Sequence, residues 1–330
     1  MYLVDWAIEG NFYLAQKYEI KRHPMKDQPA IPKSLQKGDA IALVAPSRKI
    51  HPEEIAVAEG IIRNWGFQPV HAPDLFASDH QYGGDAATRA ASFNWAIHQT
   101  DIRAIWAVRG GYGAVQVMPL IDWAAFQKHP KWICGYSDFT VMLSAAVRHG
   151  VAGLHATMPI NFTANDAQCL EVTKDILFGK WNNLSWPVAV ENRKFQRVTG
   201  QFKGRLVGGN LSVLYSQRGT LNDLDPRGAI LFLEDLDEYL YHIDRMLQNL
   251  KLGEWFQSLT AVIAGGLTQM HDNTIPFGQS PLEILRSALP SSVPLAVDAP
   301  VGHLSANYPL VMGVEATLDI ASDSNMLSYG

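Results

Sequence analysis

The segment Ile102–Thr140, IRAIWAVRGGYGAVQVMPLIDWAAFQKHPKWICGYSDFT, decides the fold. Its first apolar run, IRAIWAV, predicts a buried strand, which the glycine turn RGGYGA ends. Apolar residues at helical spacing follow from about Val115 to Gln127, and a second apolar run, KWICG, predicts the next strand. A strand, a helix and a strand in this order predict two parallel neighbours joined by a crossover helix.

The same alternation extends in both directions from this segment. Before it, AIALVAPS (40–47) predicts a strand, and PEEIAVAEGIIRNWG (52–66) predicts a helix with acids in its first turn and a glycine after its end. After it, GVAGLHATMP (150–159) and DAQCLEVTKDILFG (166–179) predict one more strand and helix. The expected fold class is α/β, with a mainly parallel sheet and flanking helices over residues 34–179.

The second half of the chain predicts another α/β domain. Residues 180–200 lose helical periodicity and are interpreted as a linker. Residues 201–322 contain the strand AILFLED (229–235), the amphipathic helix EYLYHIDRMLQNLKL (238–252) and terminal β-structure. Residues 323–330 are interpreted as a tail, and residues 1–33 as an N-terminal extension that ends near Pro29 and Pro32.

The composition and charge of the chain argue against several classes of function. The chain has 330 residues, of which 18% are charged, and a formal net charge of −5, which argues against nucleic-acid and membrane-surface partners. No HExxH pair and no Cys/His cluster has metal-site spacing, so no metal is expected. Two cysteines, Cys134 and Cys169, cannot build a disulfide framework, and the acids Asp5 and Glu9 stand where a signal peptide needs positive charge. We expect a cytoplasmic protein without a membrane span.

Ser137 is the first candidate for chemistry. It follows the strand KWICG and precedes a helical segment, so a strand-to-helix corner could expose its hydroxyl beside free backbone N–H groups. The GxSxG pattern of a nucleophile elbow is incomplete, because Phe139 stands at the second glycine position. The alternative is that Ser137 caps the helix, as serine often does at such junctions.

The glycine turn after Val108 is the second candidate. Gly110 and Gly111 allow the backbone to approach a ligand and to turn N–H groups outward. A phosphate-binding loop is a poor match, because the turn lacks both GxGxxG spacing and the lysine of a P-loop. An oxyanion-hole contribution fits better, since parallel strands would bring this turn and Ser137 to the same edge of the sheet.

A base and an acid are sought in the second half. Glu234 ends the strand AILFLED, where a carboxylate can orient a histidine or simply cap the following helix. His303 lies in a loop after a strand and a glycine, and His155 is a rival base in the first half. Asp235, like the acids at 237 and 238, is interpreted as a solvated residue at the start of a helix.

Taken together and in order, eight stretches resemble the LD-carboxypeptidases, serine peptidases that cleave L,D-peptide bonds in peptidoglycan recycling, and the related microcin C immunity peptidases. The resemblance covers roughly residues 34–322. One departure is the acid-rich DLDEYLYH (235–242), where many relatives have a glycine-containing segment. The matching stretches are KGDAIALVAPS, RGGYGA, CGYSDFTVML, LHATMP, GGNLSVL, LFLEDLDEYLYHIDRMLQNL, PFGQSPLEIL and GHLSANYPLVMG.

The resemblance implies a catalytic triad of Ser137, Glu234 and His303, and an oxyanion hole made by the backbone N–H groups of Gly111 and Asp138. It also implies that the enzyme needs no cofactor, that it releases D-alanine from a murein tetrapeptide, and that it forms a homodimer. With the serine in one half and its partners in the other, the site is expected between the two domains.

Expected substrate contacts are Arg109 and Tyr112, beside the glycine turn, and Trp186. Arg109 could seat a terminal carboxylate or pair with a nearby acid. Two other functions stay open. An immunity peptidase acting on a nucleotide-linked peptide would need an aromatic platform, for which Trp181 and Trp186 are candidates. A non-catalytic peptide- or sugar-binding protein would leave the three triad residues without a role.

Overall fold

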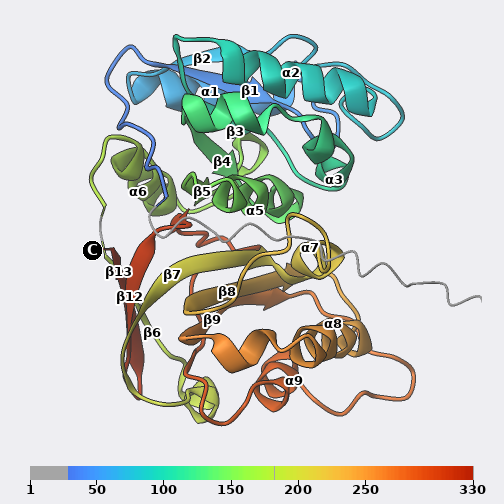
Figure 1. Ribbon diagram of the computed structural model, residues 1–330, viewed down its shortest axis with the longest axis vertical. Coiled ribbons are helices and arrows are strands. Elements are labelled where there is room, and N and C mark those ends of the chain that lie inside the picture. Colours follow the sequence, from blue (N-terminus) through green and yellow to red (C-terminus); the bar gives the residue numbers. More distant parts are fainter. Residues whose placement is uncertain (1–28, 182, 330) are drawn as a thin grey trace, which may run out of the picture.

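The computed structural model describes residues 29–181 and 183–329, so most of the expected N-terminal extension lies outside the described residues. The described part contains two β-sheets with their helices, one above the other in Figure 1. Ala30, near the start of the described range, bridges Val151 and donates its N–H to the carbonyl oxygen of Gly150. The predicted α/β class is confirmed.

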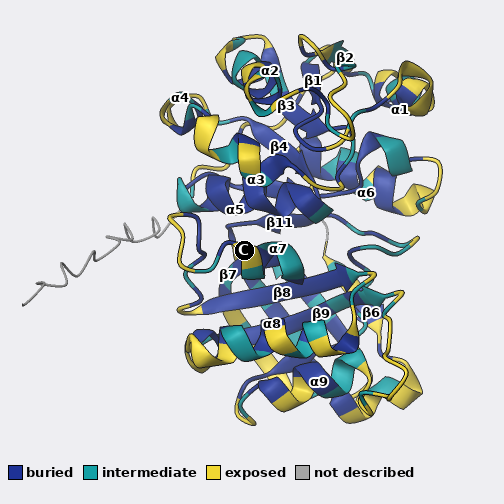
Figure 2. Ribbon diagram, turned by 90° about the vertical axis from the view of Figure 1, so that its right-hand side faces the viewer, coloured by how far each residue is buried: buried dark blue, intermediate teal, exposed yellow. Residues whose placement is uncertain are grey.

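The first sheet has the strand order β11-β5-β4-β3-β1-β2, and β1 to β5 are parallel. Apolar runs form these strands because both sheet faces are covered: α1 and α6 pack on one face and α2 to α5 on the other (Figure 2). The elements are β1 (Ala40–Val44), α1 (Pro52–Asn64), β2 (Gln68–His71), α2 (Ala86–His98), β3 (Ile102–Ala107), α3 (Ala114–Val117), α4 (Trp123–Lys128), β4 (Trp132–Gly135), α5 (Thr140–Arg148), β5 (Gly153–His155) and α6 (Ala167–Leu177).

The expectation of one helix from Val115 to Gln127 is wrong. The segment forms the short α3, a 3-10 turn over Met118–Leu120 and then α4. Pro119 has no N–H to continue an α-helix, and the carboxylate of Asp122 accepts a hydrogen bond from the N–H of Ala125 to start α4. The chain therefore bends after the glycine turn.

The second sheet has the strand order β10-β9-β8-β7-β12-β13-β6. Strands β7 to β10 are parallel, whereas β12, β13 and β6 are antiparallel to their neighbours. The helix α8 packs against α9 on this half (Figures 1 and 2). Except for β11, which joins the first sheet, the strands from residue 184 onward belong to this sheet. The elements from residue 184 onward are β6 (Leu184–Pro187), β7 (Gly200–Asn210), α7 (Leu211–Ser216), β8 (Ala229–Leu236), α8 (Leu240–Leu252), β9 (Ala261–Thr268), α9 (Pro281–Ala288), β10 (Leu295–Ala296), β11 (Leu310–Met312), β12 (Glu315–Ile320) and β13 (Ser324–Tyr329).

Two segments interpreted as connections carry strands instead. The expected linker contains β6, and the expected tail contains β13, which pairs with both β12 and β6. Alternating burial explains β13, since Asn325 and Leu327 point inward between more exposed neighbours. Within these bounds, the division of the chain into two domains stays a prediction.

The two halves are joined at several places. The strand β11, from the second half of the sequence, runs antiparallel to β5 and places Leu310 opposite His155. The β7 backbone also approaches α5 closely: a Cβ at Gly209 would lie 2.7 Å from the Thr140 side chain. These contacts bring the carboxyl ends of β4 and β8 toward the junction between the sheets.

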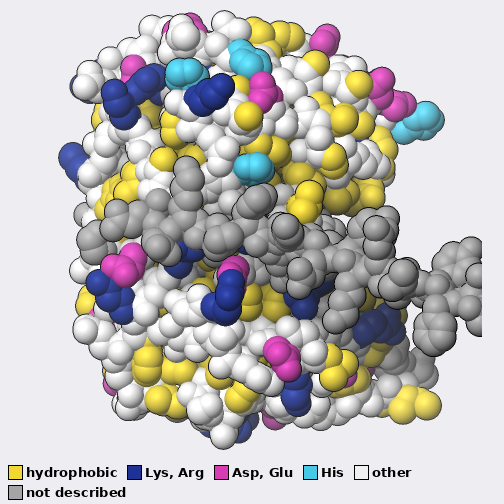
Figure 3. All heavy atoms as spheres, in the orientation of Figure 1, with side chains coloured by type: hydrophobic (Ala, Val, Ile, Leu, Met, Phe, Trp, Pro, Cys, Tyr) yellow, Lys and Arg dark blue, Asp and Glu magenta, His cyan; other side chains and the backbone are white. Residues whose placement is uncertain are grey.

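The charged surface shows no face of a single sign in the view of Figure 3, where basic and acidic side chains are interspersed over both halves. Within the described residues, no helix is both long enough and apolar enough to cross a membrane.

Candidate active site

Ser137 occupies a strained corner between β4 and α5. Its φ is +60°, in the left-handed region that non-glycine residues rarely adopt. Gly135 is required two residues earlier, because a Cβ there would lie 2.7 Å from the ring of Phe139. The alternative that Ser137 caps the helix is wrong: Phe139 is the N-cap residue of α5, and the Ser137 side chain makes no capping hydrogen bond.

The glycine turn packs directly against this serine. A Cβ at Gly110 would lie 3.2 Å from the Cβ of Ser137 and 3.3 Å from its Oγ. Gly111 has a φ of +108°, and a Cβ there would lie 2.5 Å from the Arg48 side chain. The N–H groups of Gly111 and Asp138 donate no hydrogen bond to another described residue. Two free donors thus flank the serine corner, as an oxyanion site requires.

The side chain of Asp138 fixes this corner. It is buried, and its Oδ2 accepts hydrogen bonds from the Ser47 hydroxyl at 2.6 Å and from the Ala114 N–H at 2.9 Å. Burial raises the pKa of Asp138, although both hydrogen bonds oppose the shift. One carboxylate therefore ties the end of β1 and the start of α3 to the serine turn.

Glu234 and His303 form a buried pair in the second half. The Glu234 carboxylate, at the carboxyl end of β8, is fully buried, and its Oε2 lies 2.7 Å from the Nδ1 of His303. Burial alone would lower the pKa of His303, but the charge of Glu234 and its hydrogen bond outweigh burial, so this pKa is raised. The histidine side chain keeps 15% of its surface exposed, so one edge is accessible.

The loop that carries His303 depends on two residues to which the sequence assigned no role. Gly302 has a φ of +108°, and a Cβ there would lie 2.7 Å from the Cβ of Glu234. Its N–H donates to the Oδ1 of the fully buried Asn307 at 2.8 Å, and Asn307 Nδ2 donates to the hydroxyl of Thr157 at 3.2 Å. The only sequence signal was a polar residue between a histidine and a proline.

Further contacts bring the pair to the serine turn. The ring of Tyr136, the residue before Ser137, lies 4.8 Å from the ring of His303, centroid to centroid. Asn210 is the register partner of Glu234, and its N–H donates to the hydroxyl of Thr140 at 3.2 Å. The three expected triad residues therefore gather at one junction. Within the described chain, Ser137 Oγ itself makes no hydrogen bond.

Asp235 is not the solvated acid that the sequence suggested. It is 2% exposed and accepts hydrogen bonds from Asn210 Nδ2 at 2.8 Å and from the Ser212 N–H at 2.9 Å. Burial, together with the neighbouring charge of Glu234, raises the pKa of Asp235 to about 7. The β-strand continues to Leu236, so this carboxylate points into the protein and holds the start of α7.

The rival base His155 is fully buried beneath the site. Its ring lies between those of Tyr136 and Phe232, at centroid distances of 5.8 and 5.1 Å. Burial lowers the pKa of His155 to about 4, so the imidazole is neutral at physiological pH. Since a base must reach the serine proton, its burial favours a packing role.

The expected substrate contacts divide into two groups. Arg109 donates to the carbonyl oxygen of Lys49 at 3.1 Å and lies 3.7 Å from the carboxylate of Glu54, so it pairs with a nearby acid. Tyr112 lies in the glycine turn with half of its surface exposed, free to meet a ligand.

The structure does not bring Trp186 to the site. It is buried in β6, four strands along the sheet from β8, and its indole N–H donates to the carbonyl oxygen of Val297 at 2.8 Å. Trp181 packs between Trp132 and Tyr329, at centroid distances of 6.2 and 5.7 Å. Both tryptophans stabilise the protein interior rather than a ligand.

Across the described residues, no group of three or more His, Cys, Asp or Glu side chains is arranged to hold a metal ion. A cavity of about 410 Å³ adjoins the histidine loop and is lined by Leu304 and Thr268, whose hydroxyl donates to the carbonyl oxygen of His303 at 3.2 Å. The cavity is large enough for part of a small peptide.

Comparison with known proteins matches both halves of the chain. A family model described as the LD-carboxypeptidase N-terminal domain matches residues 41–156, and one described as the LD-carboxypeptidase C-terminal domain matches residues 203–318. A probable murein peptide carboxypeptidase of Bacillus subtilis is 29% identical over 91% of this chain and 94% of its own length. A murein tetrapeptide carboxypeptidase of Pseudomonas aeruginosa is 30% identical over 84% of this chain and 92% of its own length.

The fold has the same relatives. The crystal structure of a muramoyltetrapeptide carboxypeptidase from Oxalobacter formigenes superposes with a TM-score of 0.79 at 25% identity, covering 88% of this chain and 98% of that one.

Proposed function

The chain belongs to the LD-carboxypeptidase family of serine peptidases, and from that premise we propose that it hydrolyses the L,D-peptide bond before the terminal D-alanine of a murein tetrapeptide. The observation that carries the proposal is the buried Glu234–His303 pair beside the strained Ser137 turn. In serine peptidases a carboxylate orients an imidazole, and the imidazole removes the proton of the serine hydroxyl, so these three groups at one junction can activate a nucleophile.

In the proposed first step, His303 removes the proton of Ser137 as its Oγ attacks the scissile carbonyl carbon. Since His303 Nδ1 is engaged by Glu234, Nε2 is the nitrogen left to accept that proton. Glu234 holds the tautomer and stabilises the imidazolium that forms. The N–H groups of Gly111 and Asp138 stabilise the developing oxyanion, each by about 3 to 4 kcal/mol.

In the second step, the imidazolium gives its proton to the leaving amine of D-alanine, and the C–N bond breaks to leave an ester on Ser137. Water then gives one proton to His303 as its oxygen attacks the ester, and the imidazolium passes that proton to Ser137 Oγ as the C–O bond breaks, which returns the free serine and the tripeptide acid. The buried Asp138 side chain keeps the oxyanion donors aligned throughout, because it binds both sides of the corner. No cofactor is needed for these steps.

The main alternative is cleavage of an aminoacyl nucleotide-like antibiotic. Its expected aromatic platform, Trp181 and Trp186, is used for packing, which argues against this substrate. The structure of MccF in complex with glutamyl sulfamoyl guanosine superposes with a TM-score of 0.78 at 22% identity, covering 92% of this chain and 98% of that one, so it shares the fold.

We also propose a cytoplasmic location, which fits the free and buried state of Cys134 and Cys169. The homodimer expected from the sequence stays a prediction that sedimentation equilibrium would test.

The deciding experiment is mass spectrometry of a murein tetrapeptide incubated with the native protein, with Ser137→Ala and with Ser216→Ala. Ser216, an exposed residue of α7, is the control for loss of a serine hydroxyl. We expect the native protein and the control to release one alanine, and Ser137→Ala to release none. Equal cleavage by all three would refute the assigned nucleophile. Cleavage of aminoacyl sulfamoyl adenosine, without cleavage of the tetrapeptide, would move the assignment to the alternative.

A further inference from the structure

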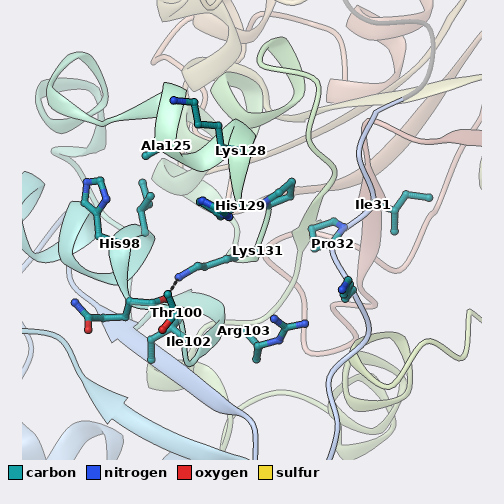
Figure 4. Close-up of a pocket in the computed structure, with 14 residues that line it drawn as sticks. Ile31, Pro32, His98, Thr100, Ile102, Arg103, Ala125, Lys128, His129 and Lys131 are labelled. Atoms are coloured by element: carbon teal, nitrogen blue, oxygen red, sulfur yellow. Dashed lines mark hydrogen bonds between the residues drawn. The ribbon is translucent and has the colours of Figure 1, made fainter.

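A second cavity lies on the first half of the protein, at the edge of the sheet opposite Ser137. It has a volume of about 620 Å³ and is formed by the segment before β1, the end of α2, the start of β3 and the loop from α4 to β4 (Figure 4). None of its described lining residues is acidic. Its basic lining residues are Lys33, His98, Arg103, Lys128, His129 and Lys131.

Lys131 is the most deeply placed of these basic residues. It is 6% exposed, and its ammonium donates to the carbonyl oxygen of Ala96 at 2.8 Å and to that of Gln99, at the end of α2. The contact with Gln99 is the dashed line that starts at Lys131 in Figure 4. An ammonium has three N–H donors, so one is left without an acceptor among the described residues. Burial lowers the pKa of Lys131 to about 8, because it disfavours the charged form more than the charge of Asp101 favours it.

Nearby carboxylates balance only part of this charge. Asp122 lies 3.4 Å from His98, and Asp39 lies 4.0 Å from Arg103. Asp101 acts on Lys131 only through its charge and opposes the lowered pKa.

Three further basic residues of the cavity, Lys33, Lys128 and His129, have no ion pair within the described part of the chain. Positive charge is therefore in excess where several side chains converge.

The cavity also has apolar walls and room for more than an inorganic ion. Ile31 and Pro32 lie across from the basic residues in Figure 4, and Ile97, Ile102 and Ala125 complete the lining. Sites for small organic ligands usually have volumes of about 300 to 1,000 Å³ and combine apolar walls with a few polar groups. Multiply charged phosphate suits a cluster of Lys, Arg and His donors.

We propose that this cavity binds a small organic molecule that carries a phosphate or diphosphate group. The free N–H donor of Lys131 and the guanidinium of Arg103 contact the phosphate oxygens, and the organic part lies against Ile31 and Pro32. A diphosphate bound there gives Lys131 a negatively charged contact, which no carboxylate of the described residues provides.

The proposed site is separate from the peptidase site. The strands β3 and β4 both begin at the cavity, beside Arg103 and Lys131, and end at the glycine turn and the Ser137 corner. The length of β3, at roughly 3.3 Å per residue, separates the cavity from that turn by about 16 Å. Binding therefore does not require Ser137, and the proposal does not depend on the substrate assigned above.

The test is isothermal titration calorimetry of the full chain with pyrophosphate, and with citrate as an anion without phosphate. We expect pyrophosphate to bind in the micromolar to millimolar range and Arg103→Gln to weaken binding about tenfold or more, because a charge-assisted contact is lost. Lys37→Gln, which removes a lysine elsewhere on this half, is the matched control and should bind as the native protein does. Ser137→Ala should also bind normally.

Lys131→Met would abolish binding, but it also removes the hydrogen bonds that Lys131 donates to the end of α2 and could destabilise that helix. Arg103→Gln is therefore the deciding variant. Circular dichroism of each variant establishes that it is folded. Absence of pyrophosphate binding up to the millimolar range would overturn the proposal, as would native affinity in Arg103→Gln. Equal binding of citrate would overturn the preference for phosphate.

Discussion

Replacing Glu234 with glutamine tests the proposed mechanism most directly. The substitution keeps the shape of the side chain and one acceptor oxygen, and it removes the charge by replacing the other carboxylate oxygen with an NH2 group. In the native protein this charge faces the imidazolium of His303 across an Oε2–Nδ1 distance of 2.7 Å, with Glu234 fully buried. For two unit charges about 4 Å apart, an effective dielectric constant of about 20 gives an interaction of about 4 kcal/mol. At about 1.4 kcal/mol per factor of ten, we expect kcat to fall about a thousandfold.

The same substitution has a second signature, in the pH profile of kcat/KM. The proposed base must be neutral, so activity of the native protein rises with pH through the raised pKa of His303. In Glu234→Gln, burial still lowers that pKa, and only the smaller effect of the Asp235 charge opposes it. The acidic limb of the profile, where kcat/KM rises with pH, should therefore move to lower pH while the maximum rate falls. A loss of rate caused by misfolding alone would not move the limb in this direction.

The stability of the protein should respond with a definite sign. The pKa of His303 is raised in the folded state, so its pairing contributes stability that is fully present below the unfolded pKa of about 6.5. This contribution is lost as pH rises through the raised folded value. Chemical denaturation at several pH values should show that the stability of the native protein relative to Glu234→Gln declines as pH rises.

The control is Glu59→Gln, which removes the charge of another Glu–His pair, on the surface of the first half. Glu59 Oε1 lies 2.5 Å from His71 Nε2, and this pair is remote from the serine turn. It should leave both kcat and the acidic limb unchanged. An unmoved limb in Glu234→Gln, with most of the rate retained, would show that Glu234 is not the partner of the base.

Two further substitutions test residues around the triad. Gly302→Ala places a Cβ 2.7 Å from that of Glu234 at a φ of +108°, so we expect the free energy of unfolding to fall by about 2 to 5 kcal/mol and kcat to drop strongly. Gly278→Ala is the control, because Gly278 also has a positive φ, +82°, but faces open space. It should show only the smaller cost of the backbone conformation. Comparable losses for both glycines in denaturant titrations would contradict the steric argument. His155→Leu should leave the acidic side of the pH profile in place, because the buried imidazole is already neutral. Loss or displacement of that side of the profile would indicate that His155 is the base.

The sequence was sufficient for the parts of the site that depend on local pattern. Ser137 and the glycine turn both follow strands of one predicted parallel sheet, whose carboxyl ends meet at one edge, so their approach followed from the strand pattern. The approach of Glu234 did not follow from it, because β8 lies in the other sheet. Buried strands and amphipathic helices were recognisable for the same reason. The family resemblance added the choice of His303 over His155, which local sequence left open.

Tertiary contacts decided what the sequence could not. Asp235 looked like a solvated acid, yet the strand continues past it and Asn210 gives it a buried partner. Trp186 looked available to a ligand, but it is buried, and its strand pairs with β13 from the far end of the chain. In both cases the partner is distant in sequence, and single-residue properties such as charge or aromaticity do not reveal it.

The strand β11 leads to a final prediction about the unity of the fold. Its residues alternate between two cores: Leu310 and Met312 pack in the core of the second half, whereas Val311 packs in that of the first. The N–H of Val311 also donates to the Tyr329 hydroxyl at 3.0 Å, so β13 is tied to the same strand. One strand thus contributes to both hydrophobic cores.

The two halves should therefore unfold in a single calorimetric transition. Val311→Ala removes two buried methyl groups and should lower the stability of the whole protein by about 2 kcal/mol, without splitting that transition. Val57→Ala, at an exposed position of α1, should leave the transition within about 0.5 kcal/mol of the native value. If the native protein shows two separate transitions, or if Val311→Ala shifts only one of them, the halves unfold independently. In that case β11 adds a strand to the edge of the first sheet without coupling the two cores. A single transition would instead explain why a site split between two sheets stays aligned: neither sheet can loosen while the strand that completes both cores is in place.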